Sequence, residues 1–365
     1  MSGLRIIIAG GGTGGHIFPA IAVGHALQRL QPGTELLFVG AKNKMEMEKV
    51  PEQGFKIIGL DIAGFNRSSL WKNISLPYKL WKSRQDARRI IKDFRPNAIV
   101  GVGGYASFPV LSAGQSAGVP TLIQEQNSYA GKSNKILAKR AKAVCVAYEG
   151  MEQFFPKEKL VLTGNPVRRN IQLMSRTGAE GKAKFGITHS GKTVLAVGGS
   201  LGAKSINECV DEQMAELMKE DINLLWQTGK PYYETAKRHA EQYNGRVKVL
   251  DFIKDMDYAY AAADVVISRA GALAIAELCI AAKPVVFVPY PFAAEDHQTS
   301  NAMALVKHNA ALLVKDSDAK TELLKKLKTI LNDEAMQGIM SKNLSAMAVK
   351  DADERIADKV IEIAK

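Results

Sequence analysis

Short apolar runs rich in β-branched residues alternate along the whole chain with longer segments of helical character, and no other sequence feature constrains the fold as strongly. Most of the runs are nearly continuously apolar, which is typical of strands buried on both faces of a parallel sheet. Strands and helices that alternate in this way form right-handed βαβ units. The predicted strands are residues 5–9, 36–39, 56–60, 98–102, 121–123, 143–147 and 160–162 in the first half, and 193–197, 223–226, 247–251, 265–268, 285–288 and 311–314 in the second.

Both halves of the chain begin with an apolar strand that runs directly into a cluster of glycines and then into a helix. The clusters are residues 10–15 and 198–202. We therefore expect an α/β fold of two doubly wound, Rossmann-like domains. Residues 1–164 are predicted to form the first domain and residues 165–341 the second, because Asn165-Pro166 interrupts regular structure. Residues from about 342 to 365 are expected to form a helix that packs back on the first domain.

Composition limits the class of protein. Hydrophobic residues make up 46% and charged residues 24% of the 365 residues, as in ordinary globular proteins. Cys145, Cys209 and Cys279 lack the spacing of metal ligands, so we expect buried thiols in a reducing cytoplasm. Glycines and Pro109 interrupt the nearest candidate for a membrane span, residues 98–113, so no span is expected. Residues 4–9 are apolar but run into glycines and are too short for the core of a secretory signal, so none is expected.

The net charge of +12 is concentrated in the first half of the chain. Residues 1–165 carry 22 basic and 11 acidic side chains, whereas residues 166–365 carry 27 and 26. This asymmetry indicates that the first half meets an anionic partner, either nucleic acid, an anionic lipid surface or a phosphorylated substrate. No nucleic-acid recognition motif accompanies the charge, so binding to nucleic acid is not expected.

The first glycine cluster contains Gly-x-Gly-x-x-Gly within residues 10–15. A dinucleotide-binding unit also needs an acidic residue at the end of the second strand, where this chain has Lys42 and no carboxylate. This argues against a nicotinamide-dependent dehydrogenase. The loop still lets backbone N–H groups and a helix N-terminus approach an anion. His16 follows directly, and it is either structural or a functional group beside a phosphate site.

Two further glycine-rich loops follow predicted strands. Residues 198–205 nearly match a nucleotide-binding P-loop, but Ala203 stands where that motif needs glycine, so we interpret this loop as a different anion cradle. Residues 101–107 follow the fourth strand, and the polar residues 124–127 follow the fifth. Any one of these could be an ordinary solvated loop. Open α/β sheets bind ligands at the carboxyl ends of their strands, so the three loops together predict a site.

Polar residues in the second half suggest a sugar nucleotide. Glu277 follows a small, apolar segment, and its carboxylate suits the vicinal hydroxyls of a ribose. The ordinary alternative is a solvated glutamate on a helix. Gln298 and Asn301 are three residues apart and share a helical face, from which they could bind sugar hydroxyls.

Two Asp-x-Asp motifs have the form that some sugar transferases use to hold a divalent cation. They are Asp255/Asp257 and Asp316/Asp318. Both stand where a helix could begin, and aspartate is a common N-cap residue. We therefore expect helix caps here, and no metal site is predicted.

Residues 67–95 contain nine basic and only two acidic side chains. Apolar residues are interleaved with the bases in a pattern that suits docking on an anionic membrane surface. The alternative is a helix that buries Ile90, Ile91 and Phe94 while the bases solvate its other face. We expect each interpretation to hold for a different part of the segment. The residues of the membrane interpretation are Trp71, Ile74, Leu76, Leu80 and Trp81, with Lys72, Lys79, Lys82 and Arg84.

The motifs and their order closely resemble those of the MurG family of UDP-N-acetylglucosamine transferases over essentially the whole chain. They are GGGTGGHIFPA at 10–20, GVGGYAS at 101–107, EQN at 125–127, GNPVR at 164–168, GGSLGA at 198–203, DFIKDM at 251–256, SRAGALAIAE at 268–277 and DHQTSNA at 296–302. The resemblance implies a GT-B glycosyltransferase fold, with two domains that face one another across a cleft holding the active site.

The resemblance also implies an activity and a location. The reaction would be an inverting, metal-independent transfer of N-acetylglucosamine, without a cofactor, from UDP-N-acetylglucosamine. The acceptor would be the 4-hydroxyl of undecaprenyl-diphosphate-linked N-acetylmuramyl-pentapeptide, a step of peptidoglycan synthesis on which cell shape and division depend. Such an enzyme would be peripheral, on the cytoplasmic face of the inner membrane, with an anionic membrane surface and other proteins of cell-wall synthesis as candidate partners.

Candidate site residues follow from the resemblance, with His16 as the catalytic base. The candidate substrate-binding residues are Thr13, Gly14, Gly15 and Asn127 around the N-acetylglucosamine, Arg168 and Ser200 near the donor diphosphate, Ile253 at uracil through its backbone, Ala272 and Leu273, Glu277 at the ribose, and Gln298 and Asn301 at the sugar. The glycine loops of the first half would face the acceptor diphosphate. Family members often carry Gln in place of Leu201, and Thr and Ser in place of Ala274 and Ala276, so phosphate contacts there would rely on backbone N–H groups.

Other functions stay open on the residues alone. Another UDP-sugar enzyme of the same fold, such as a 2-epimerase or a glycolipid synthase, would differ by lacking activity with the lipid-linked acceptor. A P-loop-like nucleotide switch would bind ATP, and Ala203 argues against it. A nucleic-acid-binding protein would show steeply salt-dependent binding, and only the charge suggests it.

Overall fold

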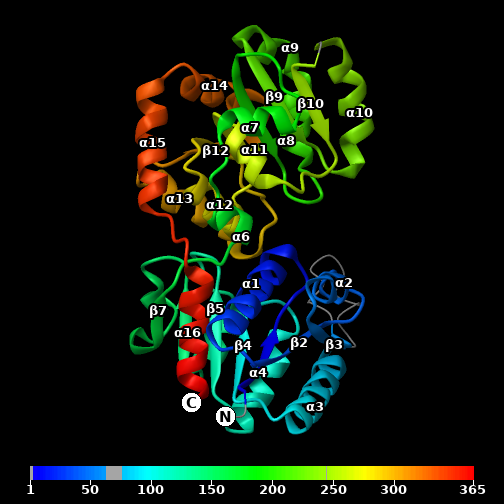
Figure 1. Cartoon of the computed structure of the whole chain (residues 1–365), viewed down its shortest axis with the longest axis vertical. Helices are drawn as coiled ribbons and strands as arrows, with labels where there is room; N and C mark the ends of the chain where they lie inside the picture. Colours follow the sequence, from blue (N-terminus) through cyan, green and yellow to red (C-terminus); the bar gives the residue numbers. More distant parts are fainter. Residues whose placement is uncertain (1–2, 63–75, 244) are drawn as a thin grey trace. The chain divides into compact units, whose positions relative to one another are not determined.

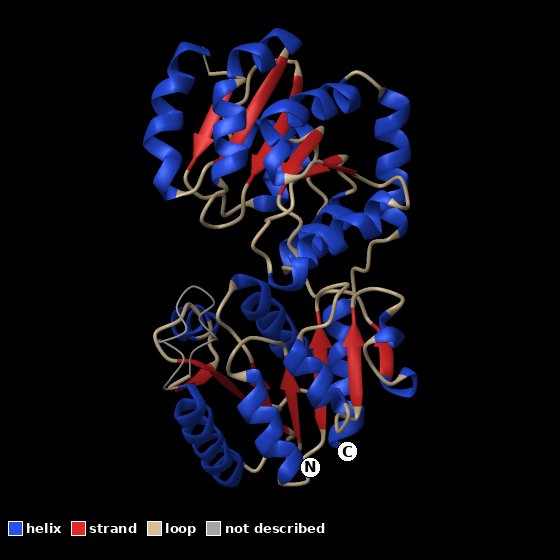
Figure 2. Cartoon of the chain, turned by 180° about the vertical axis from the view of Figure 1, so that it is seen from behind, coloured by secondary structure: helices blue, strands red, loops and turns tan. Residues whose placement is uncertain are grey.

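The computed structural model describes residues 3–62, 76–243 and 245–365, which form two compact units (Figure 1). The first unit comprises Met1–Arg168 and Asp351–Lys365, and the second comprises Arg169–Lys350. Each unit contains one sheet in which all strands are parallel, so the arrows within a sheet point the same way (Figure 2). The prediction of two doubly wound α/β domains is confirmed.

The sheet of the first unit has seven strands in the order β3-β2-β1-β4-β5-β6-β7. All seven predicted strands of the first half are present, with bounds that differ by at most two residues. The apolar side chains of the inner strands are buried on both faces, which explains why their sequence runs are almost entirely apolar, whereas the edge strands β3 and β7 are partly exposed. The strands are β1 Arg5–Ala9, β2 Glu35–Ala41, β3 Lys56–Leu60, β4 Ala98–Gly101, β5 Thr121–Glu125, β6 Ala143–Val146 and β7 Leu160–Leu162.

Helices cover both faces of this sheet. One core contains Ile6, Ile8 and Leu27, and the other contains Ile7, Ile91 and Leu111. Successive residues of β1 therefore enter opposite cores, as the period of a strand requires. The helices are α1 Gly14–Leu30, α2 Glu46–Lys49, α3 Leu76–Phe94, α4 Ser107–Ser116, α5 Lys132–Ala138 and α16 Ala352–Ala364.

The second unit repeats the design with six strands in the order β10-β9-β8-β11-β12-β13. All six predicted strands of the second half are present. They are β8 Lys192–Val197, β9 Ile222–Gln227, β10 Val247–Leu250, β11 Val265–Ser268, β12 Val285–Phe287 and β13 Leu312–Leu313. The helices are α6 Arg169–Gln172, α7 Gly178–Lys184, α8 Lys204–Glu212, α9 Met214–Leu217, α10 Lys230–Ala240, α11 Met256–Ala262, α12 Ala272–Ala281, α13 His297–Val306, α14 Ala319–Leu331 and α15 Glu334–Ala346.

The expectation of one C-terminal helix over residues 342–365 is wrong. α15 ends at Ala346, and α16 begins at Ala352. The two helices bury their apolar faces in different units, because Met340 belongs to the core of the second unit whereas Ile356 and Val360 belong to the core of the first. α16 packs against α1, and the two ribbons lie side by side in Figure 1.

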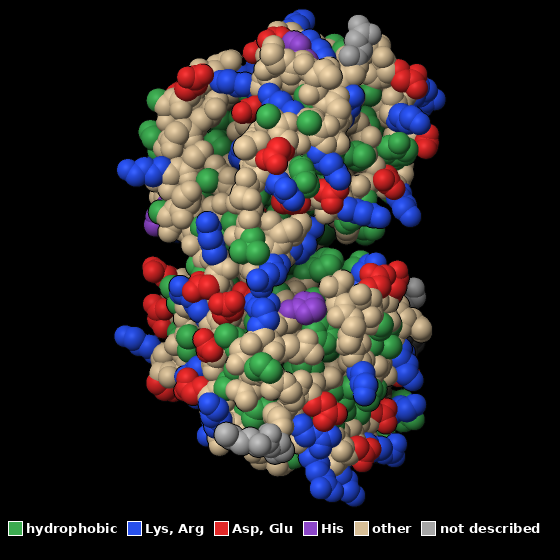
Figure 3. All heavy atoms as spheres, in the orientation of Figure 1, with side chains coloured by type: hydrophobic (Ala, Val, Ile, Leu, Met, Phe, Trp, Pro, Cys, Tyr) green, Lys and Arg blue, Asp and Glu red, His purple; other side chains and the backbone are tan. Residues whose placement is uncertain are grey.

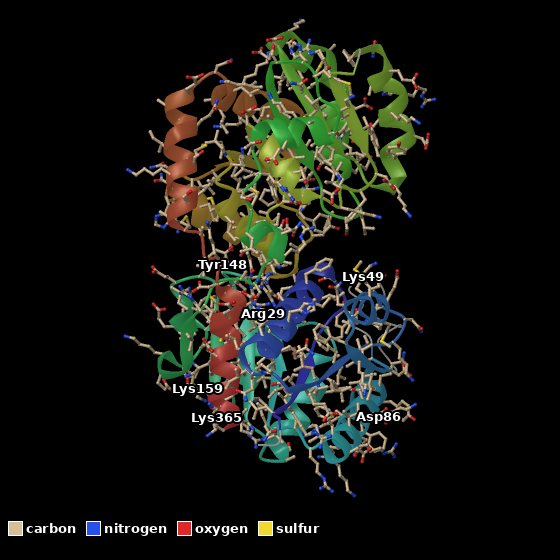
Figure 4. The ribbon with its side chains drawn as sticks, in the orientation of Figure 1. Arg29, Lys49, Asp86, Tyr148, Lys159 and Lys365 are labelled. Atoms are coloured by element: carbon tan, nitrogen blue, oxygen red, sulfur yellow. The ribbon has the colours of Figure 1, made fainter. Side chains whose placement is uncertain are left out.

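An ion pair fixes α16 to the first unit, and its loss is expected to lower the free energy of unfolding. The Arg29 guanidinium donates to Asp353 (2.9 Å) and Glu354 (3.2 Å), and Figure 4 shows Arg29 on α1 beside α16. The Asp353 side chain is only 5% exposed. Removing a charged partner from a buried acceptor costs about 1–3 kcal/mol, which we expect for Arg29→Met in urea denaturation.

Arg355→Met is the matched control for this measurement. Arg355 pairs with Asp351 at 2.9 Å, but both side chains are 51% exposed. Exposed pairs of this kind contribute about 1 kcal/mol or less. Equal losses of stability in the two variants would contradict a special role of the Arg29–Asp353 pair.

Candidate active site

The strand order of the first unit reverses between β1 and β4, and two glycine loops meet at this point. Gly11 N–H donates to the Gly103 carbonyl at 3.3 Å. A Cβ on Gly104, whose φ is +84°, would lie 2.0 Å from the Gly11 carbonyl oxygen, so only glycine permits this approach. Ligands of doubly wound sheets bind at such switch points, beyond the carboxyl ends of the strands.

His16 lies where three loops of the first unit converge. Its Nδ1 is 3.2 Å from the hydroxyl of Thr13, the residue that precedes α1. Its ring packs on Gly103, since a Cβ there would be 2.7 Å from His16 Cδ2 and 3.7 Å from the side-chain oxygen of Gln126. The structure therefore joins the loops after β1, β4 and β5 around a half-buried imidazole. Its assignment as the catalytic base stays a prediction.

The N-terminus of α1 presents Thr13, Gly14 and Gly15 beside this imidazole. Thr13 has an extended backbone, its side chain makes no capping hydrogen bond, and both Thr13 and Gly15 are exposed. N–H groups in the first turn of a helix have no partner within the helix and carry a partial positive charge. This arrangement suits an anionic or strongly polar ligand.

Asn127 is held by a buried carboxylate. Glu125, 2% exposed, accepts hydrogen bonds from the backbone and side chain of Asn127 through Oε1 and from Gly131 and Asn134 through Oε2. Four donors on one carboxylate give the loop after β5 a defined shape. Asn127 itself remains half-buried at the surface of the first unit.

Glu46 accepts a hydrogen bond from the first glycine loop, and nothing in the sequence indicates this role. Its side chain, 1% exposed, accepts from Ala41 N–H and from Gly12 N–H, both at 2.9 Å. A Cβ on Gly11 would lie 2.3 Å from its Oε1. The residue occurs in a charged helical stretch where nothing distinguishes it from a solvated glutamate.

The second unit has its own switch point between β8 and β11, with a tight turn at the end of β8. Gly202 N–H donates to the Gly199 carbonyl at 2.9 Å, which closes a turn that exposes Ser200 and Leu201. Ala203 precedes α8, which begins with Lys204. Backbone N–H groups at this turn and helix start can face an anion without a P-loop wrap.

Arg269, after β11, is hydrogen-bonded to the first turn of α8. Its guanidinium donates to the Val288 and Pro289 carbonyls, to the Ser205 hydroxyl at 3.0 Å and to the Asp316 carboxylate. The Ser205 hydroxyl also donates to Asp316. The side chain of Arg269 is only 12% exposed. It therefore ties β11 to the start of α8 and to the segment after β13.

The Asp-x-Asp motifs are engaged in ion pairs. Asp316 contacts Arg269, whereas Asp255 pairs with Lys184 at 2.9 Å and Asp257 accepts from Asn170 at 3.0 Å. Asp255 and Asp318 are the N-cap residues of α11 and α14, as expected, although neither makes a capping hydrogen bond through its side chain. Asp316 is not a cap, because Lys315 precedes the short helical turn that Asp316 begins. Within the described residues, no cluster of three or more His, Cys, Asp or Glu side chains is placed to hold a metal ion.

Glu277 is a buried carboxylate at the same end of the second sheet. Its side chain is 6% exposed, and Tyr260 donates its hydroxyl to Oε2 at 3.1 Å. The alternative of a solvated helical glutamate is wrong, because α12 turns Glu277 inward. Ala272 and Leu273 open α12 and are partly exposed, as are Ala274 and Ala276.

The two residues that are candidates for binding the sugar differ in exposure. α13 carries both Gln298 and Asn301, but Asn301 is completely buried whereas Gln298 is partly exposed. The Gln298 side-chain oxygen accepts from Tyr290 N–H at 2.9 Å, which leaves its amide NH₂ as the group that can reach a ligand. Of the pair, Gln298 is the better placed to bind one.

The remaining candidates lie on loops or at the boundary between the units. Arg168 is the last residue of the first unit before α6 and is partly exposed. Ile253, after β10, is 2% exposed, and its N–H donates to the Gln227 side chain at 2.8 Å. Gln227 and Tyr260 escaped the sequence analysis because they lie within apolar segments that gave no sign of a polar role.

The three cysteines are buried, as predicted. Burial raises the pKa of the Cys145 and Cys279 thiols to about 12 and that of Cys209 to about 11. At neutral pH these groups are protonated thiols, which are poor nucleophiles and poor metal ligands. They take no part in the candidate site.

Known proteins match this chain over nearly its whole length. Residues 6–146 match the glycosyltransferase family 28 N-terminal domain, and residues 193–356 match the family 28 C-terminal domain. A Bacteroides thetaiotaomicron protein named UDP-N-acetylglucosamine--N-acetylmuramyl-(pentapeptide) pyrophosphoryl-undecaprenol N-acetylglucosamine transferase is 53% identical, over 99% of this chain and 98% of its own. A Parabacteroides distasonis protein of the same name is 50% identical over 98% of each chain.

Solved structures show the same fold. The crystal structure of Acinetobacter baumannii MurG matches with a TM-score of 0.79 and 31% identity, over 98% of this chain and 99% of that chain. A UDP-GlcNAc 2-epimerase from Neisseria meningitidis matches with a TM-score of 0.69 at 12% identity, which shows a shared fold alone. The GT-B fold and the family matches agree, and the chain belongs to glycosyltransferase family 28, together with the UDP-N-acetylglucosamine--N-acetylmuramyl-(pentapeptide) pyrophosphoryl-undecaprenol N-acetylglucosamine transferases.

Proposed function

We propose that this enzyme transfers N-acetylglucosamine from UDP-N-acetylglucosamine to the 4-hydroxyl of undecaprenyl-diphosphate-linked N-acetylmuramyl-pentapeptide. The observation that carries the proposal is the identity of 50–53% to transferases of that name over 98–99% of the chain. The acceptor oxygen forms a bond to the anomeric carbon while the bond from that carbon to the diphosphate oxygen breaks. The acceptor proton passes to a base, and UDP leaves with the bonding electron pair.

The first unit binds the acceptor in this proposal. The glycine loops at the end of β1 and β4 face its diphosphate, and the N-terminus of α1 offers unpaired N–H groups. His16 takes the proton of the attacking hydroxyl. Its ring is fixed by contact with Gly103 and by the Thr13 hydroxyl, so that it is oriented before the substrate arrives.

The second unit binds the donor. The turn that carries Ser200 and the N-terminus of α8 stabilise the negative charge that develops on the leaving diphosphate. Arg168, the last residue of the first unit, is a further candidate for this role. Glu277 accepts hydrogen bonds from the ribose hydroxyls, and its burial makes that interaction stronger than it would be in water. Gln298 donates its amide to the sugar.

Product analysis with purified protein tests the proposal. UDP-N-acetylglucosamine and the lipid-linked acceptor together should yield UDP and a disaccharide-linked lipid. UDP-N-acetylglucosamine alone should yield neither UDP nor an epimerised sugar. Epimerisation without acceptor, or transfer to diacylglycerol only, would replace the proposal with one of the other UDP-sugar enzymes of this fold.

Docking on an anionic membrane is a separate part of the proposal, since the acceptor carries a long prenyl chain. In the described residues, no helix has both the length and the apolar character needed to cross a bilayer. The start of α3 exposes Trp81 (60%) and Tyr78 (63%), whereas its second half buries Ala87 and Ile91 in the core. Basic and acidic side chains mix on the part of the first unit where α3 lies (Figure 3). Trp71, Lys72 and Ile74 lie outside the described residues.

Vesicle co-sedimentation should show reversible, salt-sensitive binding to anionic vesicles and much weaker binding to neutral ones. Each basic side chain close to an anionic surface contributes about 1 kcal/mol to the free energy of membrane binding before screening by salt. Four such side chains therefore make a measurable contribution. Replacing the four bases with Gln should reduce binding to anionic vesicles and leave UDP affinity unchanged. The replaced residues are Lys72, Lys79, Lys82 and Arg84.

The control removes the same amount of charge from the second unit. The control variant changes four of its exposed lysines, Lys219, Lys237, Lys320 and Lys325. Replacing these with Gln should leave vesicle binding almost unaltered. Equal loss of binding in both variants would indicate a general effect of net charge. Unchanged binding after replacement of Lys72, Lys79, Lys82 and Arg84 would exclude the electrostatic part of the proposal.

A further inference from the structure

Gln227, the last residue of β9, connects the two loops that are proposed to bind opposite ends of UDP. Its Oε1 accepts the Ile253 N–H at 2.8 Å, and its Nε2 donates to the Gly199 carbonyl at 2.9 Å. The orientation of the amide is unambiguous, because an N–H needs the oxygen and a carbonyl needs the NH₂ group. The side chain is 4% exposed, so water does not compete for either contact.

The contact at Gly199 controls the turn proposed to hold the diphosphate. The Gly199 carbonyl accepts both from Gln227 and from Gly202 N–H, and the second bond closes the turn that displays Ser200. The turn also touches the backbone after β9, since a Cβ on Gly202 would lie 1.9 Å from the Thr228 carbonyl oxygen. A shift of Gln227 would therefore move the turn.

The contact at Ile253 controls the loop proposed to meet uracil. This loop follows β10, and β10 pairs with β9, so Gln227 reaches it from the neighbouring strand. With its N–H engaged by Gln227, Ile253 can offer a base only its carbonyl oxygen, which is an acceptor. The same side chain thus sets the position of the base-binding loop and the groups that it presents.

We infer that Gln227 is a positioning residue that fixes the spacing between the nucleobase subsite and the diphosphate subsite of the donor. This inference rests on the proposed function and adds to it a residue that does not itself touch the donor. UDP spans both subsites, so its affinity depends on their relative position, whereas uridine occupies only the first. A larger loss of affinity for UDP than for uridine therefore distinguishes a positioning role of Gln227 from a general loss of stability.

Asn223 provides a matched control on the same strand. It is 1% exposed, and its amide donates to the His189 and Gly191 carbonyls at 3.1 and 3.0 Å. It lies near the beginning of β9, whereas Gln227 lies at the carboxyl end beside the loops. Asn223→Leu and Gln227→Met each remove one buried amide with two backbone contacts while keeping the side-chain volume similar.

The experiment measures the affinity for UDP by calorimetry, the affinity for uridine by ligand-observed NMR, and the melting temperature of each variant. Gln227→Met should weaken UDP and uridine binding, with UDP weakened by roughly 5- to 50-fold, the scale of two lost buried hydrogen bonds. Asn223→Leu should lower the melting temperature by about as much as Gln227→Met does. It should leave the affinities for UDP and uridine within about twofold of those of the unaltered protein. The KM for the acceptor should stay unchanged in both variants.

Gln227→Glu separates the two contacts and serves if Gln227→Met does not fold. A glutamate still accepts the Ile253 N–H but cannot donate to Gly199, so uridine affinity should hold while UDP affinity falls. Equal losses of affinity for uridine and for UDP in Gln227→Glu would overturn the inference. A UDP affinity of Gln227→Met that is no lower than that of Asn223→Leu would also overturn it. If the unaltered protein binds no UDP, the proposed function itself falls; if it binds UDP and the Gln227 variants match it, only the role of Gln227 falls.

Discussion

Replacing His16 with alanine is expected to lower turnover by roughly 10²- to 10⁴-fold, the contribution of a general base. The physical reason is that the acceptor hydroxyl must lose its proton as it attacks, and His16 lies against the glycine loops proposed to hold the acceptor. UDP affinity should stay within about twofold, because the residues proposed to bind uracil and ribose lie in the second unit. A loss in kcat with an unchanged donor KM identifies an interaction made in the transition state.

His25→Ala is the matched control for this experiment. His25 lies on the same helix, α1, is partly buried, and packs its ring against Phe55 with centroids 4.7 Å apart. Its loss should lower stability without changing turnover at a temperature where the protein is folded. Near-normal turnover of His16→Ala with purified acceptor would exclude the base role, and equal losses in the two variants would indicate damage to α1 alone.

Replacing Glu277 with alanine is expected to weaken UDP binding by about 1.5–3 kcal/mol, the scale of hydrogen bonds to a charged group. Glu277 lies almost fully buried on α12, the helix that follows β11, so ribose hydroxyls would displace little water from it. Calorimetry with UDP measures the change. Turnover at saturating donor should fall much less than the affinity, since the ribose is bound equally in the ground state and the transition state.

Two further variants separate ribose binding from the loss of a buried charge. Asp257→Asn removes another carboxylate that is 6% exposed in the same unit, and it should not change UDP affinity. Tyr260→Phe removes the hydroxyl that donates to Glu277 at 3.1 Å, and it should weaken UDP binding by less than Glu277→Ala does. An unchanged dissociation constant in Glu277→Ala would exclude Glu277 as a donor ligand.

The sequence was sufficient for the sheets because parallel strands are buried on both faces. Residues 6–9 and 194–197 are apolar without interruption, and both lie in central strands. Their direct continuation into glycines located both switch points. The bounds of the C-terminal helices were less predictable, since the sequence around Met347 does not show that the chain changes its packing partner there.

The candidate site was predictable only where a residue type stands out locally. Glu277 stands out in an apolar helix, and His16 follows a glycine cluster. Glu46, Gln227 and Arg269 act through partners that are distant in sequence, for example Asp316 for Arg269, 47 residues away. No local pattern shows whether such a polar side chain meets solvent or a buried backbone group, because the answer depends on the tertiary fold.

The return of α16 to the first unit has a consequence during translation. Residues up to Arg168 leave the ribosome first, yet one core of their unit lacks Ile356, Ala357, Val360 and Ile361 until the entire second unit has been synthesised. Until then, the apolar side chains of α1 lack α16 as their packing partner. Apolar surface of this kind is a binding site for chaperones, and a premature stop codon after the second unit would leave it uncovered, which makes the truncated product a substrate for proteolysis.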